Sequence, residues 1–203
     1  MPKVSQAHVA ARRQQILEAA MACFAREGFH GTTMQDIVRQ SGLSPGAIYS
    51  YFKSKEKIIA AIADERHARE RVMIQAARTQ SSAEATLRAL ARAFFGTLGE
   101  AEGRTPRRLN VQIWAEALCN PPLHRTVRTG IDESRALLAA LIVEAQGRGE
   151  LPRHLAPDAL ARVMIALFQG FVLQQAWDDQ ADVGSYMEVI DTLLHGLTRV
   201  QRR

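Results

Sequence analysis

Apolar residues recur along the chain at the three- and four-residue spacing of amphipathic helices, and strand-like alternation is absent. Prolines and glycines separate these periodic runs. The pattern therefore predicts an all-α fold. The expected helices cover 10–26, 33–40, 45–52, 54–79, 83–101, 106–119, 123–147, 157–178 and 183–201. The polar linker TQSSAE at 79–84 separates a small N-terminal head from a larger helical body.

Two short helices in the head carry strong start signals. Thr33, with Asp36 three positions later, has the pattern of a capping box. Ser44 is a favourable N-cap, and Pro45 takes the first helical position, where its missing N–H is not needed. Gly42 lies in the tight turn between the two helices. This order matches a helix-turn-helix over about 33–52, whose second helix enters the DNA major groove, although similar spacing also occurs in helical proteins that bind no DNA.

The second of these helices has two different faces. At about 100° per residue, Ile48 and Phe52 point the same way and are expected to anchor the helix to its neighbours. Tyr51 is expected to face outward, with Tyr49 at the border between the faces. Small residues on an outward face allow a helix to approach closely, and a tyrosine hydroxyl can donate to a phosphate. The remaining outward residues are Gly46, Ala47 and Ser50, and Lys53, Lys55 and Lys57 follow them.

Charge is concentrated in the same head. The formal net charge is only +5, but the first 57 residues hold eight Lys or Arg against four acidic residues. The other 146 residues carry 18 basic and 17 acidic residues and are close to neutral. A basic end on a near-neutral body indicates a segment that binds a polyanion, although basic ends are also often simply solvated.

Composition narrows the class of protein. With 47% hydrophobic and 23% charged residues, the chain is typical of a folded globular protein. The start lacks the apolar core of a secretory signal, and the most apolar run, at 160–173, is too short to span a bilayer. Cys23 and Cys119 are too few for a disulfide framework or a zinc site, so we expect a cytoplasmic protein.

A longer pattern covers residues 12–59, which read RRQQILEAAMACFAREGFHGTTMQDIVRQSGLSPGAIYSYFKSKEKII. This run resembles the DNA-binding head of the TetR family of bacterial transcriptional regulators. The resemblance rests on Phe24, Glu27-Gly28-Phe29, Thr32-Thr33, Ile37, Gly42-Leu43-Ser44 and Tyr49-x-Tyr51-Phe52-x-Ser54-Lys55-Glu56. Val38 replaces an alanine that is usual in the family.

The resemblance implies a role for each matching position. Thr33 and Ser44 would meet phosphates, Tyr49 and Tyr51 would clamp the DNA backbone, and Lys55 would bind a further phosphate. Pro45, Gly46, Ala47 and Ser50 would lie along base edges. Gly46 and Ala47 carry no hydrogen-bonding side chain, so the choice of DNA sequence can depend partly on DNA shape. The expected DNA-binding residues are Thr33, Ser44, Pro45, Gly46, Ala47, Tyr49, Ser50, Tyr51, Lys53 and Lys55. The expected domains are a DNA-binding domain at 1–57 and an effector-binding and dimerisation domain at 58–203.

The last two predicted helices indicate a subunit interface. The helix at 157–178 is apolar almost all round and must be covered on every side, by its own core and by a second subunit. The alternative is that it lies at the centre of one subunit's bundle. We predict a two-fold four-helix interface that sets two heads on a palindromic DNA site. Its expected residues are Ile165, Val172, Leu173, Ile190, Leu193, Leu194 and Leu197.

The resemblance also implies a small-molecule effector in the body. Aromatic and polar residues on the body helices are candidates for contacting it, although each aromatic residue can equally be plain core. Glu116 can pair with a cationic or aromatic ligand or can be a surface charge. The candidates are Phe94, Gln112, Trp114, Glu116, Phe168 and Phe171.

No motif indicates catalysis. The sequence contains no H-E-x-x-H, G-x-S-x-G, P-loop or G-x-G-x-x-G pattern, so we predict no catalytic residue, no metal site and no cofactor. The prediction is a homodimeric repressor that a small molecule releases from its DNA operator, by shifting the helix at 55–79 and changing the spacing of the heads. The competing hypothesis is a helical ligand carrier or enzyme with an incidental helix-turn-helix.

Overall fold

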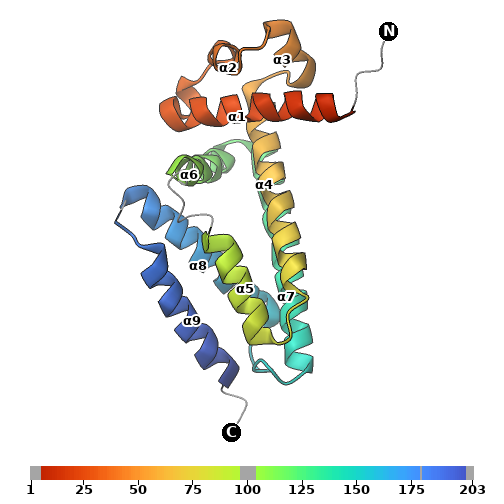
Figure 1. Cartoon of the computed structure of the whole chain (residues 1–203), viewed down its shortest axis with the longest axis vertical. Coiled ribbons are helices and arrows are strands. Elements are labelled where there is room, and N and C mark those ends of the chain that lie inside the picture. The colour runs from red at the N-terminus through yellow and green to blue at the C-terminus, as the bar shows by residue number, and fades with distance from the viewer. Residues whose placement is uncertain (1–5, 97–103, 179, 200–203) are drawn as a thin grey trace. The chain divides into compact units, whose positions relative to one another are not determined.

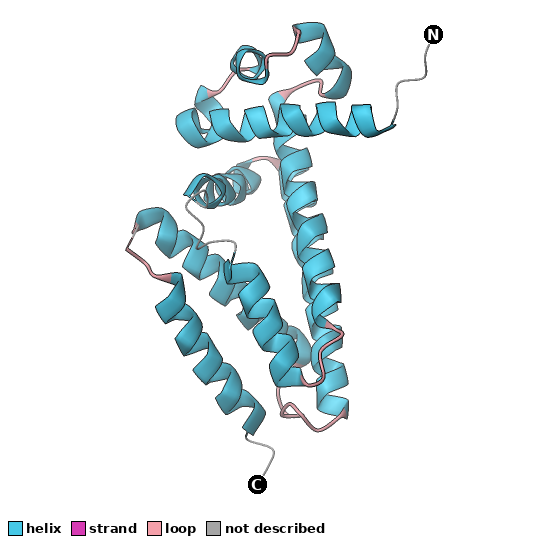
Figure 2. Cartoon of the chain, viewed as in Figure 1, coloured by secondary structure: helices cyan, strands magenta, loops and turns pink. Residues whose placement is uncertain are grey.

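The structure is a computed structural model that describes residues 6–96, 104–178 and 180–199. Within these ranges the chain forms nine helices and no strand (Figures 1 and 2). The all-α prediction is therefore confirmed, and most predicted helices agree with the structure to within a few residues. The helices are α1 (Gln6–Gly31), α2 (Met34–Ser41), α3 (Pro45–Tyr51), α4 (Lys55–Ala77), α5 (Ala83–Gly96), α6 (Arg104–Cys119), α7 (Pro121–Gly147), α8 (Pro157–Trp177) and α9 (Val183–Arg199).

The chain divides into two compact units, and the division differs from the predicted domain boundary at residue 57. The first unit combines residues 1–65 with residues 108–127, and the second combines residues 66–107 with residues 128–203. Most of α6 therefore packs with the N-terminal head, and α4 and α7 each begin in the first unit and end in the second. Hydrophobic periodicity could not reveal this, because it shows that a helix has a buried face but not which partner covers it.

The first unit has a core where α1, α2 and α3 meet. Ile16 and Phe24 of α1, Ile37 of α2 and Ile48 of α3 are fully buried. The inward orientation predicted for Ile48 and Phe52 is confirmed, since Phe52 is only 6% exposed. These contacts orient the short helices α2 and α3, which are too short to be stable alone.

The predicted helix starts are present. Thr33 and Asp36 form the capping box of α2, with both reciprocal hydrogen bonds made. Ser44 caps α3 by accepting from the backbone N–H of Ala47, and Pro45 is at the start of the helix. Gly42 ends α2 in the left-handed conformation, with φ 68°, which a residue with a side chain adopts only with strain. Local sequence therefore defines the helix-turn-helix almost completely.

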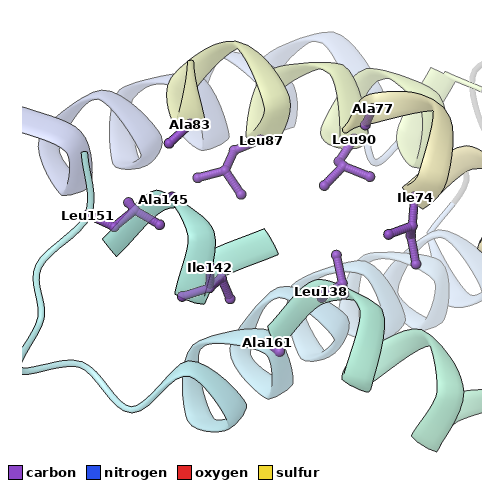
Figure 3. Close-up of a cluster of buried hydrophobic side chains, with 10 residues drawn as sticks. All are labelled: Ile74, Ala77, Ala83, Leu87, Leu90, Leu138, Ile142, Ala145, Leu151 and Ala161. Carbon is purple, nitrogen blue, oxygen red and sulfur yellow. The ribbon is translucent and has the colours of Figure 1, made fainter. Parts of the chain in front are cut away.

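The second unit has its own apolar core, shown in Figure 3. Ile74 at the end of α4, Leu87 and Leu90 of α5, and Leu138 and Ile142 of α7 point toward one another. Ala161 of α8 completes this cluster. The cluster packs the C-terminal part of α4 against α5, α7 and α8.

Helices α8 and α9 leave large apolar side chains outside this core. Val163, Val189 and Leu193 are 54%, 57% and 56% exposed. The predicted interface residues Ile165, Leu173, Leu194 and Leu197 are half-buried, and Ile165, Leu194 and Leu197 pack against the core of the second unit. By length and composition α8 could cross a membrane, and only 22% of its most apolar window is buried within the chain.

Two of the predicted interface residues are already covered by their own chain. Val172 is 0% exposed and Ile190 is 6% exposed, so this burial does not favour a contact with a second subunit, and their role stays a prediction. On an all-apolar helix the sequence shows that every side is covered. It does not distinguish the side that faces the chain's own core from the side that faces a partner.

Candidate nucleic-acid interface

Helix α3 presents a small polar outward face. Pro45, Gly46, Tyr49 and Ser50 are exposed, while Ala47 is half-buried. A Cβ added at Gly46 would have no atom within 4 Å, so no described residue covers this position. A helix with such a face can lie deep in a groove, where side chains reach base edges.

The two serine hydroxyls at the start and within α3 already have partners within the head. Ser44 Oγ accepts from the N–H of Ala47 at 3.2 Å, and Ser50 Oγ donates to the carbonyl of Ala47 at 2.6 Å. Ser50 retains its lone pairs as acceptors, and its only donor is occupied. Direct readout by α3 therefore depends on few hydrogen-bonding groups.

The two tyrosines differ from the expected order. Tyr49, placed at the border of the outward face, is 43% exposed, and Tyr51, placed on that face, is half-buried. Tyr51 is the last residue of a seven-residue helix, and Phe52 after it leaves the helix with φ −133° and ψ 122°. Angular rules for a regular helix are least reliable where the helix ends.

Lys55 occupies a more constrained position than Lys53. Lys55 Nζ donates to the carbonyls of Phe29 at 2.9 Å, of Thr32 at 3.1 Å and of His30 at 3.5 Å. It also lies 4.7 Å from the centre of the Phe29 ring. Lys53 Nζ instead donates to a single carbonyl, that of Tyr49, at 2.8 Å. Since an ammonium has three donors, the predicted phosphate contact of Lys55 stays a prediction that this geometry does not favour.

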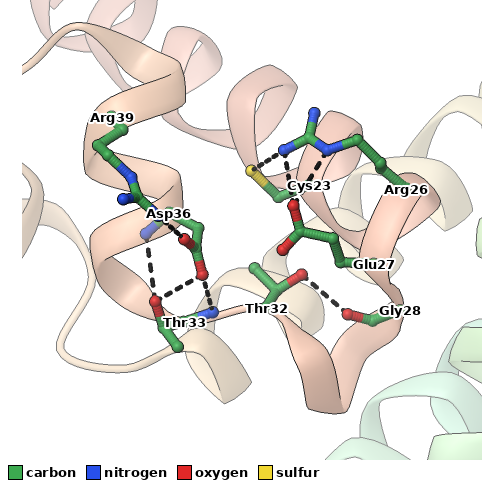
Figure 4. A network of polar contacts seen from close by, with 8 residues as sticks. All are labelled: Cys23, Arg26, Glu27, Gly28, Thr32, Thr33, Asp36 and Arg39. Carbon is green, nitrogen blue, oxygen red and sulfur yellow. Dashed lines mark hydrogen bonds and ion pairs between the residues drawn. The ribbon is translucent and has the colours of Figure 1, made fainter.

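Figure 4 shows one set of polar contacts at the end of α1 and another at the start of α2. Thr33 donates to Asp36 Oδ2 from its backbone N–H at 2.8 Å and from its hydroxyl at 2.6 Å, and Arg39 also donates to Asp36. These hydrogen bonds, with those from Thr33 first, lower the pKa of Asp36 to about 2. Asp36 is therefore ionised at neutral pH and holds Thr33, whose hydroxyl is committed to the cap.

Helix α6 contacts the same head. Glu116 Oε2 lies 3.1 Å from His30 Nε2 near the end of α1, and Asn120 donates to the other oxygen of Glu116 at 3.3 Å. The sequence leaves two alternatives for Glu116, a ligand contact or a surface charge. In the structure Glu116 pairs with His30 of the head. Sequence reasoning missed this pair because its members are far apart in the chain.

The six candidate effector residues are divided between the two units. Gln112, Trp114 and Glu116 belong to the first unit. In the second unit, Phe168 meets Phe94 edge-on at 5.4 Å between ring centres, and the buried Phe171 stacks on Tyr186 at 4.1 Å. Their role in binding an effector stays a prediction.

Comparison with known proteins identifies the family. The profile described as "Bacterial regulatory proteins, tetR family" matches residues 16–62. The profile described as "BetI-type transcriptional repressor, C-terminal" matches residues 83–199, more than half of the chain. The chain belongs to the TetR family of bacterial transcriptional regulators.

Individual relatives agree with this TetR-family assignment. The regulator BetI of Escherichia coli O157:H7 is 31% identical over 87% of each chain. The solved structure of Salmonella enterica GusR is 28% identical, with a TM-score of 0.79 over 97% of this chain and 99% of that one. The repressor Rv1474c of Mycobacterium tuberculosis is 45% identical, but the match spans only 32% of this chain and 35% of that protein.

The resemblance seen in residues 12–59 is therefore confirmed. The protein is a DNA-binding transcriptional regulator with a TetR-type fold. The individual DNA-contacting residues stay predictions, and the exposed face of α3 is their structural basis.

Proposed function

We propose that this TetR-family protein is a homodimeric cytoplasmic repressor that binds a palindromic operator and is released from it by a small molecule. The observation that supports this proposal is the outward face of α3, which is exposed and has small side chains. Both α3 and the preceding helix α2 have capped starts. In a helix-turn-helix this face enters the major groove, and Tyr49 at its edge reaches the phosphate backbone.

The apolar surface of α8 and α9 supports the dimer. Val163, Val189 and Leu193 are each more than half exposed on two consecutive helices. Pairing this surface with its two-fold copy removes it from water and also explains why so little of α8 is buried within one chain. Two symmetric heads then match two half-sites about 34 Å apart.

The effector is expected in the second unit. Among TetR-type folds, the FadR of Bacillus subtilis has been solved in complex with stearoyl-CoA, at 20% identity to this chain. In this chain, the pocket lined by Leu87, Ile142 and Leu151 measures about 40 Å³. Ligand pockets have roughly 300–1,000 Å³, so this one is too small for an effector. Phe94 and Phe168 are better candidates.

Selection of binding sites from random duplex DNA tests this proposal. The expected result is a palindromic consensus with half-sites one helical turn apart, bound with an affinity that falls steeply as salt rises. A screen of metabolites and drugs for release of the selected DNA then tests the effector. If no duplex binds above background at low salt, while the protein turns over a substrate, the helix-turn-helix is incidental and the protein is an enzyme.

A further inference from the structure

Helix α4 is packed unusually closely against α7 at one position. Gly130 of α7 is buried, and a Cβ added there would lie 2.2 Å from both Cγ and Cδ2 of the His67 ring and 2.8 Å from the His67 Cβ. Carbon atoms in contact are normally about 3.5 Å apart or more. The glycine is therefore required by the neighbouring histidine and not by α7, because glycine is less favourable than alanine inside a helix.

The His67 ring has no room to move aside. Its exposed fraction is 1%, and its Nδ1 lies 2.9 Å from Glu70 Oε2. Arg66 Nε lies 3.2 Å from the other oxygen of Glu70. Burial alone would raise the pKa of Glu70, but the hydrogen bond from His67 and the charge of Arg66 lower it, so Glu70 is a carboxylate and Nδ1 is the donor. His67 Nε2 has no hydrogen-bond partner within the described chain, so Glu70 orients the ring.

This contact lies where α4 enters the second unit. The N-terminal stretch of the first unit ends at Glu65, and α4 continues unbroken from Lys55 in the first unit to Ala77 in the second (Figure 1). Farther along α4, Ile74 lies in the same buried cluster as Leu138 of α7. The position of α4 on α7 is therefore set at two points, His67 and Ile74.

We propose that the His67–Gly130 contact fixes the angle between α4 and α7, with Ile74 as the fulcrum, and that the size of residue 130 sets this angle. This inference rests on the proposed function. A side chain at position 130 would push His67 away by roughly 1 Å to restore an ordinary contact. Ile74 lies about 10 Å from His67 along α4, and Lys55 lies about 18 Å from His67 on the other side. If Ile74 stays in place, a shift of this size at His67 becomes roughly 3 Å at Lys55. A displacement of this size moves each head away from its half-site.

The test compares G130A with a matched glycine substitution on the same helix. Gly147 ends α7 and would receive a Cβ with nothing within 4 Å, so G147A is the control. Operator DNA selected with the wild-type protein is the probe. G130A is expected to bind it at least ten-fold more weakly, with G147A unchanged, and H67A/G130A is expected to recover most of the loss because the ring is gone.

A second measurement gives the distance between the two heads in the absence of DNA. Glu18 is exposed on α1, so a spin label on E18C in each subunit reports the distance between the two heads. C119S removes the exposed free cysteine, which would otherwise also be labelled. G130A is expected to change this distance by several ångströms, and G147A and H67A/G130A are expected to leave it near the wild-type value.

Three results would overturn the proposal that residue 130 sets the angle of α4. They are equal operator binding by G130A and G147A, an unchanged label distance in G130A, and a loss that H67A does not reverse. If G130A does not fold, H67A/G130A decides alone: recovery of folding and binding supports the clash, and failure to recover contradicts it. Absence of operator binding by the wild-type protein is a separate outcome, which defeats the proposed function.

Discussion

The hydrogen-bond partners of Lys55 favour a structural role over a contact with DNA. Its ammonium is surrounded by the carbonyls of Phe29, His30 and Thr32, which follow the break in α1 at Gly28. The first residue of α4 thereby holds the chain segment that leads into α2. We infer that Lys55 positions the helix-turn-helix.

The variant K55M tests this role against the phosphate contact that the family resemblance implies. Loss of the ammonium leaves three carbonyls without their donor, which is expected to lower the free energy of unfolding by about 1–3 kcal/mol. The slope of log affinity against log salt is expected to stay unchanged. K53M is the control, expected to reduce that slope by about 1 with little loss of stability. Thermal unfolding and a salt titration of operator binding measure both, and a reduced slope in K55M would restore the phosphate role.

Asp36 makes the stability of the head depend on pH. Its pKa is lowered to about 2 in the folded protein, chiefly by hydrogen bonds from Thr33. A lowered carboxyl pKa stabilises the fold above the unfolded-state value, near 4, and this stabilisation is lost as pH falls through 2. D36A is therefore expected to melt below wild type at pH 7, with the difference shrinking from about pH 4 downward. A difference that is constant across this range would show that the carboxylate charge is not involved.

At the scale of single helices, Gly46 of α3 is a position where a substitution is expected to change DNA binding without lowering stability. A Cβ at this position would touch nothing in the described chain, so G46A is expected to leave stability unchanged or raise it by up to about 1 kcal/mol. If α3 lies against base edges, the same methyl group is expected to lower operator affinity at least ten-fold. Melting temperature and operator titration of one protein sample measure both. Unchanged affinity would mean that Gly46 does not face DNA.

The sequence predicts those features that depend on neighbours in the chain. Thr33 with Asp36, and Ser44 with Pro45, fix two helix starts within four residues, and the structure has both. What the sequence could not predict depends on distant contacts. Lys55 meets residues more than twenty positions away, and Val172 faces its own core although its helix is apolar on every side.

At the scale of the whole molecule, Leu193 tests the dimer. It is 56% exposed on α9, and glutamate at this position would place two like charges at a two-fold interface. L193E is expected to sediment as a monomer and to bind the operator at least ten-fold more weakly. V143E, at a 54% exposed valine on α7, is the control and is expected to stay dimeric. A dimeric L193E that still binds the operator tightly would place the subunit interface elsewhere.

The grouping of α6 with the head bears on protein engineering. A hybrid regulator is simplest to design by joining the first 57 residues of one protein to the body of another. In this chain that junction would separate His30 from Glu116 and replace the 108–127 segment that completes the first compact unit. The exchangeable part here is discontinuous in sequence, so a head grafted without its own α6 would carry an uncovered surface into its new host.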